Sequence, residues 1–120
     1  MTYTNDVTYI NDVVGAAIFD LNGLPKEYFT TTDNNNMSWV QTIFQVLGLR
    51  SLLASSLQLE NFRHSTIQGK EYYAIVVKQR THYTALLLHQ TSSEIPIAVI
   101  DWAQTFELEA LHTNPRFQVA

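Results

Sequence analysis

The sequence predicts a single α+β domain, an α/β/α sandwich in which helices cover one five-stranded antiparallel sheet. Two observations predict it: apolar, β-branched runs typical of buried strands, and one long helical stretch that separates two strands from three. The expected order is helix, two strands, long helix, three strands, helix. No repeat or linker divides the 120 residues, so we expect one domain over 1–120, with its core at about 7–110 and a loose tail over 111–120.

The composition narrows the class of function. Hydrophobic residues make up 46% of the chain, which is typical of a folded globule and not of a disordered segment. The net charge is −4 and the seven Lys and Arg residues are scattered, so we expect no nucleic-acid partner. The chain has no cysteine, which excludes disulfides and thiolate chemistry. The N-terminal residues lack the positive and apolar regions of a secretion signal, so we expect a cytoplasmic protein.

The first two strands are expected on either side of a tight turn. Residues 13–21 are apolar almost throughout, as in a strand buried on both faces, and residues 26–32 are more polar, as in an outer strand. Asn22-Gly23 followed by Pro25 is strong turn chemistry. A short helix over 4–12 precedes these strands, and the polar run over 33–36 leads into the long helix.

The long helix is expected over 38–59, starting at a capping box of Ser38 and Gln41. At about 100° per residue one broad face carries most of its apolar side chains. That face holds Trp39, Val40, Ile43, Val46, Leu47, Leu53, Ala54 and Leu57, while Phe44, Leu49 and Leu52 fall outside it. Arg50 is the only charge from Trp39 to Leu59, and with several glutamines and serines it argues against a membrane span. We therefore expect a second copy to cover the helix; the alternative is that the extra apolar residues are simply exposed.

The remaining strands follow the long helix. Residues 61–68 make a weak, polar strand, whereas 71–80 and 82–90 make two strong strands joined as a hairpin. The C-terminal region allows two interpretations, because 95–100 is β-branched like a sixth strand while the apolar spacing continues as in a helix. We expect a helix over 94–110.

A short pattern in the first hairpin resembles the roadblock family, which includes the dynein light-chain roadblock and bacterial regulators of small Ras-like GTPases. The pattern is Gly15, an apolar strand that ends at Asp20, and then Gly23 and Pro25. The resemblance spans about residues 7–110 and implies a homodimer or heterodimer in which the long helices pack together and the third strands pair. The chain departs from the family pattern in two ways: its first helix is short, and its long helix is rich in aromatic residues.

The resemblance and the long helix together give the expected interaction residues. The dimer interface is expected at Trp39, Ile43, Phe44, Leu47, Arg50 and Arg63. Tyr28 on the outer strand is the candidate for docking a partner, which the resemblance implies is a small GTPase or a scaffold protein. The alternative for Tyr28 is that it packs under the helices.

No arrangement of residues in the sequence is typical of an enzyme. The four histidines lack metal-ligand spacing, and no phosphate-binding or nucleophile motif is present, so we expect no metal, no cofactor and no catalysis. Asp20 is a conceivable general base, but beside Asn22-Gly23 it more simply caps the turn. Three functions remain open: a dimeric interaction module, a small-molecule sensor with a pocket between sheet and helix, and a GTPase activator without an arginine finger.

Overall fold

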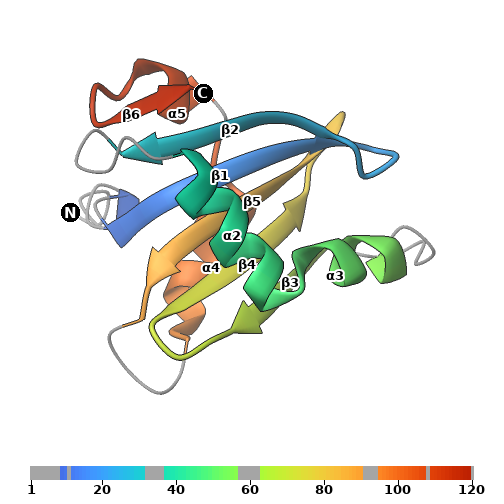
Figure 1. Ribbon diagram of the computed structural model, residues 1–120. Helices are drawn as coiled ribbons and strands as arrows, with labels where there is room; N and C mark the ends of the chain where they lie inside the picture. The colour runs from blue at the N-terminus through green and yellow to red at the C-terminus, as the bar shows by residue number, and fades with distance from the viewer. Residues whose placement is uncertain are drawn as a thin grey trace.

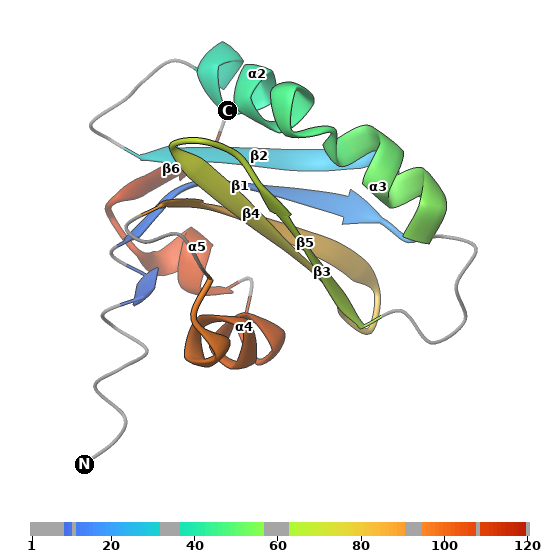
Figure 2. The same ribbon diagram turned by 90° about the horizontal axis from the view of Figure 1, so that it is seen from below.

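The computed structural model describes residues 9–10, 12–31, 37–56, 63–90, 95–107 and 109–119. It forms an antiparallel sheet covered by helices on both faces (Figures 1 and 2). The predicted first helix over 4–12 lies largely outside the described residues, although Tyr9, Ile10 and Asp12 are helical. None of the helices in the described ranges is long and apolar enough to cross a membrane.

The sheet contains the five predicted strands in the order β3-β4-β5-β1-β2, and a short sixth strand extends it beyond β2. The strands are β1 (Val13–Asp20), β2 (Pro25–Thr31), β3 (His64–Gln68), β4 (Tyr72–Lys78), β5 (His82–His89) and β6 (Phe117–Val119). Every neighbouring pair is antiparallel. The predicted α+β sandwich with a five-stranded antiparallel sheet is therefore confirmed.

The helices lie in two layers. Figure 2 shows α2 (Met37–Leu47) and α3 (Leu49–Ser56) over one face, and α4 (Ile97–Gln104) and α5 (Glu109–Thr113) over the other. Successive side chains of a strand point to opposite faces of the sheet, so alternate residues of the central strands pack against the two helix layers. In β4, Ala74 and Val76 belong to the α2/α3 cluster, whereas Ile75 and Val77 belong to the α4/α5 cluster. All four side chains are 0% exposed, so β4 needs cover on both faces.

The predicted long helix is two helices in the structure. Gly48 separates α2 from α3 with φ of 79°, a left-handed conformation that favours glycine. Its N–H donates to the carbonyl of Gln45 (3.0 Å), and its own carbonyl accepts from Leu52 N–H (3.1 Å). A helical projection assumes helical backbone angles at every residue, so one projection through residue 48 cannot describe both α2 and α3.

The predicted apolar face of this region is also wrong, and in α2 the difference lies before the break at Gly48. Phe44, Leu49 and Leu53 pack against the sheet at 3–4% exposure, although Phe44 and Leu49 were expected outside the face. Val46 was expected on that face and is 78% exposed.

The C-terminal region also differs from the single helix expected over 94–110. The helix α4 ends where Thr105 Oγ1 donates to the carbonyl of Trp102 (3.1 Å), and α5 begins at Glu109. The tail that was expected to be loose contains the end of α5 and the strand β6 within residues 111–119. Leu111 and Phe117 are buried in the α4/α5 cluster, and β6 pairs with β2. Burial of these two apolar side chains is the physical reason that the tail is ordered.

Two groups of hydrogen bonds connect distant parts of the chain on the α4/α5 face. The buried hydroxyl of Thr84 donates to Gln79 Oε1 (2.7 Å), and Gln79 Nε2 donates to the carbonyl of Phe106 (2.5 Å). This chain of bonds links the β4–β5 hairpin to the segment between α4 and α5. Arg116 Nη1 donates to the carbonyls of Ile10 (3.0 Å) and Val13 (2.9 Å), which joins the C-terminal turn to the start of β1.

Replacing Gly48 by Ala should destabilise the fold through backbone strain alone. A Cβ atom at this position would meet nothing within 4 Å, so no steric clash contributes. The left-handed conformation costs an L-residue roughly 1–2 kcal/mol, and Asn tolerates it better. Urea unfolding should therefore show a loss of about that size for Gly48→Ala and a smaller loss for Gly48→Asn. Equal stability of wild type and Gly48→Ala would contradict the positive φ.

His82 should make stability depend on pH. Burial lowers the pKa of His82 below its usual 6.5, and its buried Nε2 has no hydrogen-bond partner among the described residues. The unfolded chain therefore binds a proton more readily than the folded chain between the two pKa values. The free energy of unfolding should rise with pH up to about 6.5 and fall as pH drops through this window.

The measurement is urea unfolding from pH 5 to 8 of wild type, His82→Gln and His89→Gln. His89 is exposed at the other end of β5 and serves as the matched control. The pH slope should be smaller in His82→Gln and unchanged in His89→Gln. A slope that survives in His82→Gln would assign the effect to another group.

Candidate interaction surfaces

The hairpin motif shapes a turn in this structure. Asp20 Oδ1 accepts the backbone N–H groups of Asn22 and Leu24, each at 2.9 Å. Gly23 has φ of 86°, and its N–H donates to the carbonyl of Asp20 (2.9 Å). The Asp20 carboxylate is therefore used to cap the turn. Pro25 starts β2 opposite Phe19, where the pairing of the two strands shifts.

Gly15 has a different place from the turn residues. It is buried within β1, between Thr30 of β2 and Leu87 of β5. Among the described residues, no group of three or more His, Asp or Glu side chains could hold a metal ion. From these positions, Gly15 contributes to the centre of the sheet, and Asp20, Gly23 and Pro25 shape its first hairpin.

The edge of the sheet at β3 is the first candidate surface. Lys78 N–H donates to the carbonyl of Arg63, and Gly69 N–H donates to the carbonyl of Tyr72, both at 2.9 Å. Backbone groups alternate along an antiparallel strand, so residues 63, 65, 67 and 69 face β4. The backbone groups of His64 and Thr66 consequently point away from the sheet. Within the described ranges, no strand lies beyond β3 on this side.

The sequence of β3 does little to protect this edge. The strand is HSTIQ, with no Lys, Arg, Asp, Glu or Pro. Exposed edge strands usually carry such residues because they discourage pairing with another chain. Arg63 is exposed but lies just before the strand, with its carbonyl already bonded to β4. The edge is thus suited to pairing with another strand.

The outer surface of α2 and α3 is the second candidate. Among the side chains of α2 and α3 that the structure describes, the exposed ones are uncharged apart from Arg50. They are Gln41, Thr42, Gln45, Val46, Arg50, Ser51, Ala54 and Ser55. Leu52 of α3 and Ile67 of β3 are both partly buried at the margin of the same cluster, so the helical surface and the β3 edge border one apolar core.

The predicted interface residues separate into three groups. Phe44 is 3% exposed and packs on the sheet, so its side chain is used by the domain's own core. Ile43 is partly buried, and Arg50 and Arg63 are exposed. The side chains of Trp39 and Leu47 lie outside the described residues.

Tyr28 is only partly available. Its ring lies edge-on to Phe19 (6.3 Å between centroids), beside the α2/α3 cluster. Burial raises the pKa of Tyr28, and the positive charge of Arg50 acts against this rise. The edge of β2 was expected to be open, but β6 covers it from Phe29 to Thr31.

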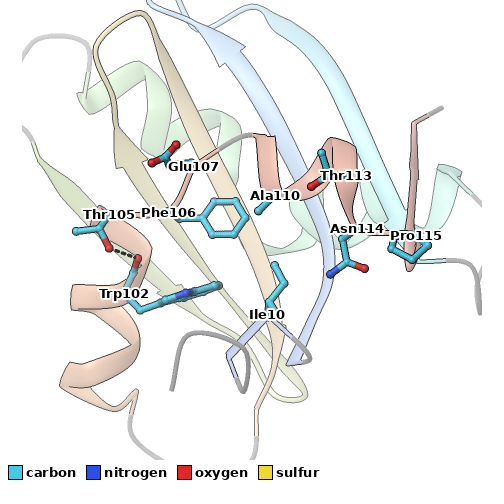
Figure 3. Close-up of a pocket in the computed structure, with 9 residues that line it drawn as sticks. All are labelled: Ile10, Trp102, Thr105, Phe106, Glu107, Ala110, Thr113, Asn114 and Pro115. Atoms are coloured by element: carbon cyan, nitrogen blue, oxygen red, sulfur yellow. Dashed lines mark hydrogen bonds between the residues drawn. The ribbon is translucent and has the colours of Figure 1, made fainter. Parts of the chain in front are cut away.

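A hollow of about 490 Å³ lies on the opposite face of the domain (Figure 3). Its lining residues are Ile10, Trp102, Thr105, Phe106, Glu107, Ala110, Thr113, Asn114 and Pro115. The rings of Trp102 and Phe106 meet edge to face at 5.1 Å. The hollow is open to solvent, and it is bordered by α4, α5 and Ile10. It therefore differs from the pocket between sheet and helix that the sensor hypothesis expected.

Comparisons with known proteins place the fold. No family model matches the sequence, and no curated protein matches it either. Among solved structures, MglC from Myxococcus xanthus is similar with a TM-score of 0.51 and 14% identity, over 85% of this chain and 89% of MglC. The gliding protein MglB from Thermus thermophilus gives a TM-score of 0.44 at 14% identity, over 82% of this chain and 79% of MglB. The chain therefore has the roadblock-like fold expected from its sequence, in the form represented by MglC.

Proposed function

We propose that this protein is a non-catalytic, dimeric interaction module that binds and regulates a small Ras-like GTPase or a related partner complex. The observation that carries the dimer is the unprotected edge of β3 beside an almost uncharged helical surface. The partner class rests on the sequence resemblance and is consistent with the roadblock-like fold.

The geometry of β3 gives the dimer a specific pairing. Thr66 is the middle residue of β3, and its backbone groups face away from β4. Antiparallel pairing about a two-fold axis at Thr66 overlaps all five residues of β3 with those of the second copy. The two sheets then become one continuous sheet, and the α2/α3 layers of both copies lie on the same side of it. This arrangement brings the uncharged helical surfaces toward one another.

A non-catalytic role is supported by the engagement of the polar groups. Asp20 caps a turn, and Gln79 and Thr84 satisfy one another and the carbonyl of Phe106. Such a module would act on a GTPase by remodelling it, because nothing in the sequence marks an inserted arginine.

The competing function is a small-molecule sensor, and the hollow of Figure 3 is the observation in its favour. Its lining contains one charged side chain, Glu107, and an apolar floor of aromatic and aliphatic groups. Binding sites for small molecules enclose most of their ligand, whereas this hollow is open to solvent. The interaction module therefore ranks first.

Thr66→Pro should separate the dimer and leave each copy folded. Proline at 66 removes an N–H that faces away from the sheet, so the bonds from β3 to β4 remain. Sedimentation at micromolar concentration should change from a dimer to a species of 13.7 kDa. Thr66→Val is the matched control: it keeps the backbone donor and should remain dimeric.

The absence of cysteine allows an independent check of the pairing. Thr66→Cys should form a disulfide-linked dimer on mild oxidation, since directly paired residues have Cα atoms about 5.5 Å apart. Ser65→Cys should not, because it would pair with position 67 of the other copy. A wild-type monomer, or a dimer that Thr66→Pro leaves intact, would reject β3 pairing.

Binding of a GTPase should depend on the dimer and not on nucleotide alone. The probe is a small Ras-like GTPase from the same organism, loaded with GDP or with a non-hydrolysable GTP analogue. Calorimetry should detect binding by wild type and at least tenfold weaker binding by Thr66→Pro. GTP, ATP and divalent metals alone should leave the melting temperature unchanged, whereas a ligand at 100 times its Kd adds about 2.7 kcal/mol. A nucleotide-induced shift in melting would favour the sensor.

A further inference from the structure

The two edges of the sheet differ in how they are protected. The β3 edge carries no charged residue or proline. The β2 edge begins with Pro25, Lys26 and Glu27, a proline and two charges that discourage pairing with another strand. Its second half lacks such residues, and this half is the part covered by β6.

The covered half of β2 is well suited to strand pairing. Phe29, Thr30 and Thr31 are 0%, 2% and 4% exposed, and they pair with Val119, Gln118 and Phe117 of β6. Aromatic and β-branched residues favour strands, and an uncharged run of them is a template for further pairing when it is uncovered. β6 has only three residues, so it is itself a poor template.

Contacts outside the strand ladder hold β6 in place. Phe117 is 7% exposed in the α4/α5 cluster, and the Arg116 guanidinium lies 5.3 Å from the centre of its ring. His112 Nε2 lies 3.2 Å from Glu27 Oε1, and the His112 ring lies 5.3 Å from that of Phe29. α5 and β6 therefore contact β2 as one unit.

We propose that Phe29–Thr31 form a second strand-pairing surface for another copy of this chain, and that β6 keeps this surface closed. The consequence for assembly depends on the proposed dimer. If each copy offered both a β3 edge and a β2 edge, copies would join edge to edge without limit. With the β2 edge closed, pairing through β3 is two-fold and stops at two copies. The C-terminal strand thus sets the size of the assembly.

The test removes β6 in two backgrounds. A chain that ends at Arg116 lacks residues 117–120 but keeps the Arg116 bonds to Ile10 and Val13. In the wild-type background, sedimentation should show species larger than a dimer whose mass increases with concentration. In the Thr66→Pro background, where β3 cannot pair, the same truncation should convert a monomer into a dimer of about twice its mass.

The Thr66→Pro background separates this proposal from the proposed function. If full-length Thr66→Pro still dimerises, β3 pairing is wrong, yet truncation should still add one step of association. If truncation adds none and the chain still unfolds cooperatively, the second surface is rejected. Phe117→Ser keeps the chain length and removes only the buried ring, so it should increase association in the same direction. If neither variant unfolds cooperatively, the domain cannot fold without β6. In that case β6 is an essential part of the core, and the proposal also fails.

Discussion

The burial of the central strands on both faces is the constraint on which the rest of the structure depends. In β4 and β5, consecutive side chains from Tyr73 to Val77 and from Tyr83 to Leu88 are all buried. The apolar side chains on both faces of such a strand are removed from water only if one layer of helices covers each face. The α2/α3 layer and the α4/α5 layer meet this requirement, and β1 beside β5 extends the same two-sided core. The backbone groups at the edges of the sheet are the ones that these two layers do not cover.

Much of the fold could be predicted from local sequence. The apolar runs of β1, β4 and β5 specify buried strands by themselves, and Asp20, Gly23 and Pro25 specify the turn that joins β1 to β2. These signals are short in range: each depends on neighbours within a few residues. The two-layer arrangement follows because strands that are apolar on both alternations need two covers.

The rest depended on single residues or on distant contacts. One backbone angle at Gly48 divides the long helix and changes which side chains face the sheet, and a helical projection cannot detect it. The strand β6 has three residues and pairs with β2 across most of the chain, so no periodicity marks it. At the candidate surface, the exposed strand β3 was predicted from its polar sequence. Phe44 was predicted to lie outside the apolar face of the long helix, but its side chain is buried against the sheet.

The two bonds from Arg116 to Ile10 and to the first residue of β1 have a consequence for synthesis. Arg116 Nη1 reaches the carbonyls of Ile10 and Val13, which lie 106 and 103 residues earlier. Contacts of such long range close late, because ordering the intervening chain costs entropy before the contact forms. A growing chain exposes its N-terminal part first, so β2 emerges from the ribosome long before the residues that cover it. β6 can pair with β2 only after it has left the ribosome, and until then β2 of each nascent chain lacks the strand that covers Phe29–Thr31.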